Sequence, residues 1–330
     1  MISIKDIRSG NNKILVLGNH EGIIQSILDF DYLSGKSEGS ITGIVTGRPG
    51  FAKYFWGRKE ILIPTLVSLS PFTFNLVPNT NLWLLNLLSG RRTLASTLDF
   101  LSTDHCKLHA NIAGAALFAE NVPELHSQQL IKSNTLQTDH CKLCTSLVVG
   151  PASVGLLVPG VLKLGPIGGI TPVQINESHL TEPGSVAVLS ASGGMTNELI
   201  NIATGGGARL SFALSFGGDR FPVLSPRDAF ILAEEDPATK SILYYGELGG
   251  EDEYDLVKLK EEGKFTKHVI AHIAGTVSNL FPESPQFGHA KAKADKDRVT
   301  ASAKREALTK AGFAVSNSFS EFINLASKLK

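Results

Sequence analysis

The sequence KILVLGNHEG, residues 13–22, decides how the chain begins to fold. Its apolar run predicts a buried strand that ends at Gly18, and apolar residues at helical spacing predict a helix over residues 22–33. A strand, a tight turn and a helix in this order open a βαβ unit of the kind that binds nucleotides. Ligands of such sheets bind beyond the carboxyl ends of the strands, so we expect one crevice among the turns at residues 18–22, 46–49 and 119–123.

The alternation of strands and helices continues along the chain. In the first half, apolar runs predict strands over residues 40–45, 82–88, 111–118 and 146–149, with helices over 92–101 and 122–132. Residues 150–171 are rich in glycine and proline and predict a crossing segment. The pattern then resumes with strands over 185–190, 210–216, 241–246, 268–274 and 312–315 and helices over 195–203, 226–234, 253–262 and 300–311. The sequence therefore predicts an α/β fold with two doubly wound domains, over residues 1–165 and 166–330.

Composition excludes several classes of partner. The 330 residues include 31 basic and 31 acidic residues, so no overall field favours nucleic acid or an anionic membrane. No apolar run approaches the roughly 20 residues that span a bilayer. The first residues lack the pattern of a signal or transit peptide. We therefore expect a soluble cytoplasmic protein that binds neither nucleic acid nor membrane.

Three cysteines occur, and two of them lie in a repeated hexapeptide. The sequence TDHCKL stands at residues 103–108 and again at 138–143, where Cys144 follows. Histidine and cysteine are ligands of soft divalent metals, but neither spacing matches a familiar zinc pattern. We therefore favour chance recurrence in a variable region and expect no metal site.

The segment QFGHA, residues 286–290, provides the first candidate for chemistry. Small neighbours leave the imidazole of His289 accessible, and a neutral imidazole is a competent nucleophile near neutral pH, although such a histidine is more often a turn residue. Glu247, in the segment GELGG at 246–250, follows a predicted strand and could orient an imidazole, or be an ordinary surface acid. The glycine pair Gly217–Gly218 after another strand lets the backbone approach a ligand or a neighbouring subunit.

A glycine-containing turn supplies a candidate anion site. The segment SGGMTNE, residues 192–198, places small residues at the start of a predicted helix directly after a strand. The backbone N–H groups and the helix dipole there suit a phosphoryl or carboxylate group. An ordinary strand-to-helix turn explains the same residues equally well.

Eight motifs in order carry a resemblance that covers most of the chain. The chain resembles the family of succinyl-CoA synthetase α subunits and ATP-citrate lyases, in the segments LDFDY (28–32), WGRKEILIP (56–64), GPASVG (150–155), PGSVA (183–187), SGGMTNE (192–198), GGDR (217–220), GELGG (246–250) and QFGHA (286–290). The segment at 56–64 and the Phe-Gly-His motif are similar to the citrate branch. Within it, the chain most resembles the small subunits of citryl-CoA synthetases.

The resemblance implies a fold and a role for each motif. It implies a Rossmann-like CoA-binding domain followed by a flavodoxin-like ligase domain. His289 resembles the phosphohistidine that passes a phosphoryl group from ATP to citrate, forming citryl phosphate, and Glu247 the acid that orients it. Ser192, Gly193 and Gly194 match the helix start that binds the phosphoryl group and the substrate carboxylate. The family's CoA site falls on Gly18, Asn19, Gly22, Arg48, Pro49 and Glu120.

The resemblance also implies partners. The chain has no phosphate-binding loop of the Gly-x-x-x-x-Gly-Lys-Ser/Thr type, as expected if ATP and Mg²⁺ bind an ATP-grasp large subunit in a heterotetramer. Because the sequence ends at Lys330, we expect citryl-CoA cleavage to belong to a separate lyase. The alternatives are a subunit of a two-chain ATP-citrate lyase, a succinyl-CoA synthetase α subunit and a CoA-responsive binding protein without turnover. Two positions depart from the family pattern: Lys291 replaces a glycine, and Ala191 replaces an arginine common in the citrate branch.

Overall fold

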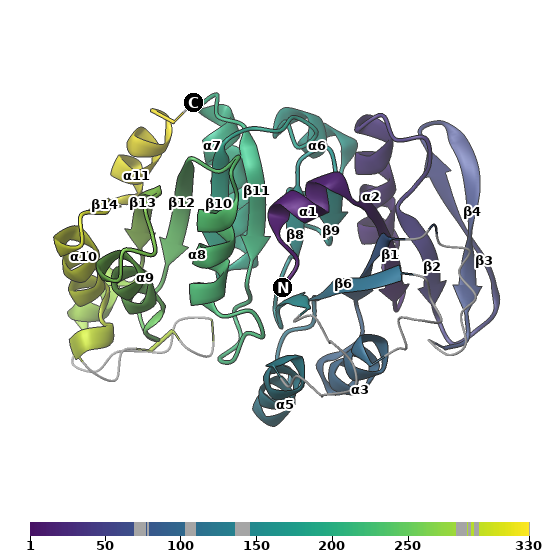
Figure 1. The fold of residues 1–330 in the computed structure, drawn as a ribbon, viewed down its shortest axis with the longest axis horizontal. Coiled ribbons are helices and arrows are strands. Elements are labelled where there is room, and N and C mark those ends of the chain that lie inside the picture. The colour runs from purple at the N-terminus through teal and green to yellow at the C-terminus, as the bar shows by residue number, and fades with distance from the viewer. Residues whose placement is uncertain are drawn as a thin grey trace.

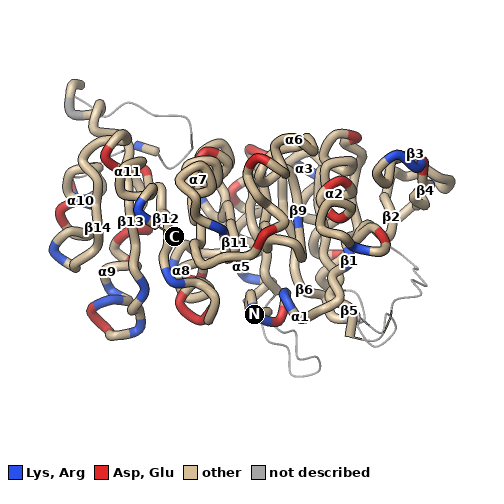
Figure 2. Tube along the Cα trace, turned by 90° about the horizontal axis from the view of Figure 1, so that it is seen from above, with Lys and Arg blue, Asp and Glu red and all other residues tan. Residues whose placement is uncertain are grey.

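The computed structural model describes residues 1–68, 77, 79–102, 110–135, 146–281, 289, 292–293 and 297–329. These residues form two seven-stranded sheets, one in each half of the chain, and helices pack against them (Figure 1). The α/β fold with mostly parallel sheets, predicted from the alternating pattern, is confirmed. Seen from above, charged residues of both signs are spread over both halves (Figure 2).

The first sheet has the strand order β3-β4-β2-β1-β5-β6-β7. Its strands are β1 (Asn11–Leu17), β2 (Ile41–Val45), β3 (Gly50–Trp56), β4 (Lys59–Leu66), β5 (Thr80–Asn86), β6 (Ala110–Leu117) and β7 (Leu147–Val149). The helices of this half are α1 (Ile4–Ser9), α2 (Glu21–Leu33), α3 (Gly90–Leu101) and α5 (Glu124–Thr135). The expected strand, turn and helix at the start are β1 and α2. Helix α1 was not expected, nor was the antiparallel pair of β3 and β4, which are joined by a turn in which Gly57 has φ +62°.

The second sheet has the order β14-β13-β12-β10-β11-β8-β9. Its strands are β8 (Leu156–Val158), β9 (Leu162–Leu164), β10 (Val186–Ser190), β11 (Leu210–Ser215), β12 (Ser241–Gly246), β13 (His268–Ile273) and β14 (Ala314–Val315). The helices are α6 (Pro172–Glu177), α7 (Gly193–Gly205), α8 (Pro226–Glu235), α9 (Asp252–Glu261), α10 (Ala301–Lys310) and α11 (Phe319–Ala326), with short 3₁₀ turns η1 (Thr276–Leu280) and η2 (Asp297–Val299). Strands β10 to β13 are parallel, so their carboxyl ends meet at one edge.

The glycine- and proline-rich crossing segment contains two short strands that sequence patterning did not predict. β8 and β9 form a hairpin, and β8 pairs antiparallel with β11 of the second sheet. The chain therefore passes from one sheet to the other between Val149 and Leu156, ahead of the expected division after residue 165, and the division itself stays a prediction. Strands of three residues are too short for a periodicity to identify.

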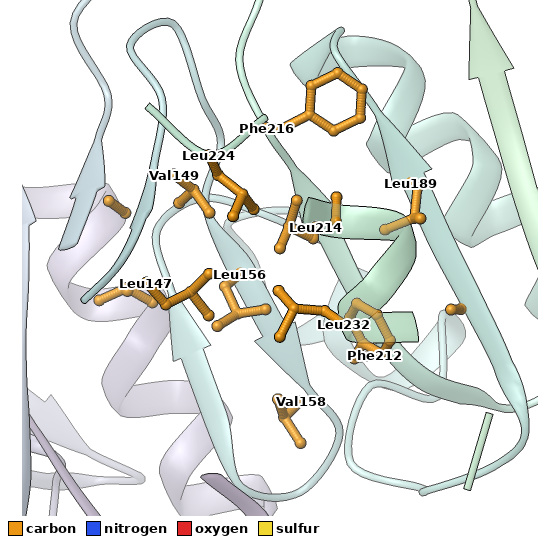
Figure 3. Close-up of a cluster of buried hydrophobic side chains, with 14 of the residues drawn as sticks. Leu147, Val149, Leu156, Val158, Leu189, Phe212, Leu214, Phe216, Leu224 and Leu232 are labelled. Carbon is orange, nitrogen blue, oxygen red and sulfur yellow. The ribbon is translucent and has the colours of Figure 1, made fainter. Parts of the chain in front are cut away.

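An apolar core continues from the first sheet into the second. The buried cluster of Figure 3 includes Leu147 and Val149 of β7, Leu156 of β8 and Leu214 of β11, and all four are at most 1% exposed. Burying one such side chain contributes about 1.5–3 kcal/mol. The shared core holds the carboxyl edges of both sheets close to one another, which matters for the site described below.

Polar side chains are buried where α2 of the first half packs on the β8–β9 hairpin, a contact that we call the seam. Lys163 of β9 donates to Oγ of Ser26 at 3.0 Å and to the carbonyl of Gly165 at 2.9 Å. Burial lowers the pKa of Lys163 to about 7, although the carboxylates of Asp31 and Asp29 oppose this shift. The seam therefore holds a buried lysine whose ammonium form is destabilised.

Candidate active site

The turn at residues 247–250 follows β12 at the carboxyl edge of the second sheet. Gly249 and Gly250 have φ of +79° and +62°, a left-handed conformation that favours glycine. Gly246 must also lack a side chain, because a Cβ there would lie 2.1 Å from Oε1 of Glu253. The local sequence thus forces a tight turn that presents Glu247.

His289 and Glu247 are in direct contact. Nδ1 of His289 lies 2.8 Å from Oε2 of Glu247, and the two side chains are 31% and 16% exposed. An ionised carboxylate only accepts hydrogen bonds, so Nδ1 is the donor, and in the neutral ring Nε2 then carries the lone pair. The Nε2 edge of the ring faces the backbone of Gly218, where a Cβ would lie 2.7 Å from Nε2. The contact sets the tautomer that a histidine nucleophile needs.

The helix start predicted to bind an anion is formed by α7. Ser192 is its N-cap, and its Oγ accepts from the backbone N of Met195 at 3.4 Å. Gly193 and Gly194 occupy the first turn, where backbone N–H groups have no acceptor within the helix. A Cβ on Gly193 would lie 2.5 Å from Val154, whereas one on Gly194 would meet nothing within 4 Å. Close packing therefore explains Gly193, and Gly194 leaves the helix start open.

A cavity of about 380 Å³ joins the histidine to this helix start. It is lined by residues of both halves, among them Glu120, Ser192, Gly194, Gly218, Asp219 and His289. Asp219 follows β11, and its Oδ2 accepts from the backbone N of Val122 in the first half, at 3.1 Å. Burial raises the pKa of Asp219, and the charge of Glu120 adds to this. The cavity thus places an imidazole nitrogen, a helix N-terminus and a half-buried acid around one space.

A second cavity of about 290 Å³ adjoins His289. It is lined by Glu247 and His289 and otherwise by mostly apolar residues, including Tyr245, Leu248 and Val277. His289 therefore lies between the cavity that reaches the start of α7 and this second, mostly apolar cavity.

The residues predicted to bind CoA follow parallel strands of the first sheet. Gly18 has φ +86° and follows β1, and Asn19 accepts at Oδ1 from the hydroxyl of Tyr54 at 3.1 Å. Gly22 lies in the first turn of α2, and the exposed Arg48 and Pro49 follow β2. Because β1 and β2 are parallel, these residues share one edge of the first sheet. Glu120 follows β6, which is parallel to β1 through β5, and it also lines the cavity of His289.

Sequence reasoning did not assign three features that the structure places at the site. Gly218 was noted only as part of a glycine pair after a strand, yet it contacts the ring of His289. Asp219 lines the cavity, and its position after β11 was the available signal. Lys304 of α10 donates to the carbonyl of Glu247 at 2.7 Å, and nothing in its local sequence indicates this.

Several predictions fall on residues outside the described ranges. These are both TDHCKL segments and Lys291. Across the described residues, no group of three or more histidine, cysteine, aspartate or glutamate side chains could hold a metal ion. The helices formed by those residues include none long and apolar enough to cross a bilayer.

Known proteins resemble both halves of the chain. Residues 189–314 match the CoA-ligase family. Over 95% of this chain, ATP-citrate synthase of Mus musculus is 36% identical and a probable ATP-citrate synthase subunit 1 of Schizosaccharomyces pombe is 33% identical. The chain spans only 27% and 49% of these relatives.

A solved structure extends the likeness to three dimensions. The structure of ATP citrate lyase from Methanothrix soehngenii in complex with citrate and coenzyme A matches 96% of this chain, with a TM-score of 0.87 and 36% identity, and the match covers 49% of that protein's chain. The family indicated by the sequence motifs is thereby confirmed. The chain belongs to the CoA-ligase family that contains the succinyl-CoA synthetase α subunits and the ATP-citrate lyases.

Proposed function

We propose that the chain is the small, α-like subunit of a citryl-CoA synthetase, which forms citryl-CoA from citrate, CoA and ATP. The observation that carries this proposal is the contact of 2.8 Å between His289 Nδ1 and Glu247, with Nε2 against Gly218 at the cavity. A histidine oriented by a carboxylate beside a helix N-terminus is suited to accept a phosphoryl group.

The proposed reaction has three steps. The Nε2 lone pair attacks the γ-phosphorus of ATP, so an N–P bond forms while the bond to the ADP oxygen breaks. A citrate carboxylate oxygen then takes the phosphoryl group, which breaks the N–P bond and gives citryl phosphate. Finally the CoA sulfur, after losing its proton to solvent or phosphate, attacks the acyl carbon, and phosphate leaves.

The residues of this chain supply orientation and electrostatics for these steps. Glu247 holds the Nδ1 proton and stabilises the imidazolium form that develops when Nε2 becomes phosphorylated. The backbone N–H groups of Gly193 and Gly194 at the start of α7 offer partial positive charge to phosphoryl oxygens. Ser192 closes the cap of this helix.

CoA and the nucleotide are assigned to different places. We place CoA at the edge of the first sheet, near Gly18, Asn19, Gly22, Arg48 and Pro49, with Glu120 toward the cavity. The structure of the Methanothrix soehngenii relative in complex with citrate and coenzyme A supports these two substrates. ATP and Mg²⁺ are assigned to an ATP-grasp large subunit, with which the chain forms a cytoplasmic heterotetramer.

A substrate comparison with the purified complex tests the proposal. We expect CoA-dependent ADP release with citrate and no comparable release with succinate, and mass spectrometry should detect citryl-CoA. Faster turnover of succinate would instead identify a succinyl-CoA synthetase. Tight CoA binding without ADP release under any condition would identify a CoA-responsive binding protein.

The names of the relatives favour a second candidate, a subunit of an ATP-citrate lyase. The two candidates differ in their products. A complex that contains lyase activity releases acetyl-CoA and oxaloacetate, whereas a synthetase stops at citryl-CoA. Product analysis of the same reaction therefore separates them.

A further inference from the structure

Lys304 lies against the 247–250 turn, although 57 residues separate it from Glu247 in the sequence. Its side chain is 1% exposed, and its Nζ donates to the carbonyl of Glu247 at 2.7 Å and to that of Gly249. The same ammonium pairs with Oε2 of Glu253 at 2.6 Å. Two hydrogen bonds to carbonyls and one close carboxylate thus surround the buried ammonium.

Glu253 is itself fixed on its other oxygen. The hydroxyl of Tyr244 donates to Oε1 at 3.0 Å, and Gly246 packs so closely against that oxygen that a Cβ would lie 2.1 Å away. The side chain of Glu253 is 2% exposed. Removing either Glu253 or Lys304 would therefore leave the other as a buried charge without compensation. The pair therefore holds Lys304 in one position.

The backbone on both sides of Glu247 is consequently tied down. The carbonyl of Gly246 accepts from the backbone N of Ala274 at 2.9 Å, and the carbonyl of Glu247 accepts from Lys304. Gly249 is held twice, by Lys304 at its carbonyl and by the carbonyl of Val299 at its N–H, at 2.8 Å. With its main chain fixed, the Glu247 carboxylate has few ways to leave Nδ1 of His289.

We infer that Lys304 is a positioning residue for phosphoryl transfer. By holding the carbonyls of Glu247 and Gly249, it aims the Glu247 carboxylate at Nδ1 of His289 and so keeps the lone pair on Nε2. This inference rests on the proposed phosphorylation of His289. It assigns a site function to a buried ion pair that otherwise only contributes to the fold.

The double variant Lys304→Met/Glu253→Leu tests the inference, because it removes the carbonyl contacts without leaving a buried charge unpaired. The first readout is the tautomer of His289. It is measured by ¹⁵N NMR of the full chain labelled at histidine, and His289→Asn is used to assign the signal. We expect the Nδ1–H tautomer in the native chain and a mixture in the double variant, as in Glu247→Ala. This readout needs neither ATP nor a partner.

The second readout is the initial rate of phosphohistidine formation in the complex with the large subunit. We expect the double variant to lower this rate between about 10-fold and 100-fold, the range that a small displacement of a catalytic group causes. In a Glu247→Ala background the same double change should have no further effect, whereas a purely structural role would lower the rate in both backgrounds. Lys163→Met, at a buried lysine away from the site, is the control and should leave the rate unchanged.

The outcomes separate the two claims. A native tautomer and a native rate in the double variant would overturn the positioning role of Lys304. A native complex that is never phosphorylated would overturn the proposed function, and the NMR arm would still decide whether Lys304 orients Glu247.

Discussion

Two buried lysines, one at the seam and one beside the 247–250 turn, show how differently this fold treats the same side chain. Lys163 has two neutral acceptors, Ser26 Oγ and the Gly165 carbonyl, and burial lowers its pKa to about 7. Two acceptors suit the two N–H groups of a neutral amine. Lys304 donates to two carbonyls and lies 2.6 Å from the carboxylate of Glu253, an opposite charge that, among the described residues, the seam lysine lacks at such a distance.

The two lysines differ in how well their surroundings compensate a buried charge. At the seam a charged lysine is tolerated poorly, because Asp31 and Asp29 only partly compensate its desolvation. Beside the turn the ammonium of Lys304 lies 2.6 Å from the carboxylate of Glu253, next to the residues that we expect to carry chemistry, and its charge opposes the rise that burial causes in the pKa of Glu253. The backbone around Glu247 is thus anchored by a lysine with a carboxylate partner, whereas the seam holds its lysine with two neutral acceptors.

The largest effect is expected from breaking the ion pair beside the turn. Glu253→Ala leaves Lys304 buried without its carboxylate, and we expect the free energy of unfolding to fall by about 3–5 kcal/mol. Urea denaturation at pH 7 measures this. Lys304→Met/Glu253→Leu should recover most of the loss, since neither charge then remains. A cost below about 1 kcal/mol for Glu253→Ala would show that the pair is not the strong contact described here.

The second effect concerns pH at the seam. Unfolded Lys163 keeps its proton up to a pKa near 10.4, whereas the folded side chain loses it near pH 7, so the unfolded state binds more protons between these values. Stability must therefore rise with pH in this window. We expect a gain of about 2 kcal/mol in the free energy of unfolding from pH 7 to pH 9, relative to Lys163→Met. Parallel pH profiles of the two proteins would contradict the environment assigned to Lys163.

A third prediction concerns Gly218, which lies beside the Nε2 edge of the His289 ring. In Gly218→Ala the new Cβ would lie 2.7 Å from Nε2 of His289, so the ring must shift. We expect phosphohistidine formation to slow at least about tenfold, which corresponds to roughly 1.4 kcal/mol, with little change in melting temperature. Gly205→Ala is the matched control, because a Cβ there meets nothing within 4 Å. Equal rates for Gly218→Ala and the native chain would show that this wall tolerates a side chain.

The smallest effect is expected at a neutral contact of the seam. Ser26→Ala removes one of the two acceptors of Lys163, and a neutral hydrogen bond contributes about 1 kcal/mol. We therefore expect a loss of about 1 kcal/mol in thermal or urea unfolding and no change in phosphorylation. A loss as large as that of Glu253→Ala would erase the contrast between the two lysines.

The regular part of the fold was predictable because it leaves a periodic trace. Apolar runs such as that before Gly18 identify parallel strands buried on both faces. The hairpins β3–β4 and β8–β9 were missed, since antiparallel pairing depends on partners across a turn and three-residue strands carry no period. Local sequence cannot show that β8 joins a sheet whose other strands come after it.

Site residues were predictable only where they lie within a motif of the family. The sequence alone offers His289 and Glu247 as separate candidates, and only the family resemblance joined them. The structure brings them into contact across 42 residues, while their catalytic roles stay predictions. Lys304 acts through its ammonium on carbonyl groups, a contact that any sequence at residues 247–249 could make. Such a partner is visible only in three dimensions.

The most direct test of the central claim is labelling of the chain with [γ-³²P]ATP in the presence of the large subunit. We predict an acid-labile label on this chain, located by mass spectrometry at His289, that appears only with the partner and disappears in His289→Ala. Label that persists in His289→Ala, or that maps to another residue, would contradict it.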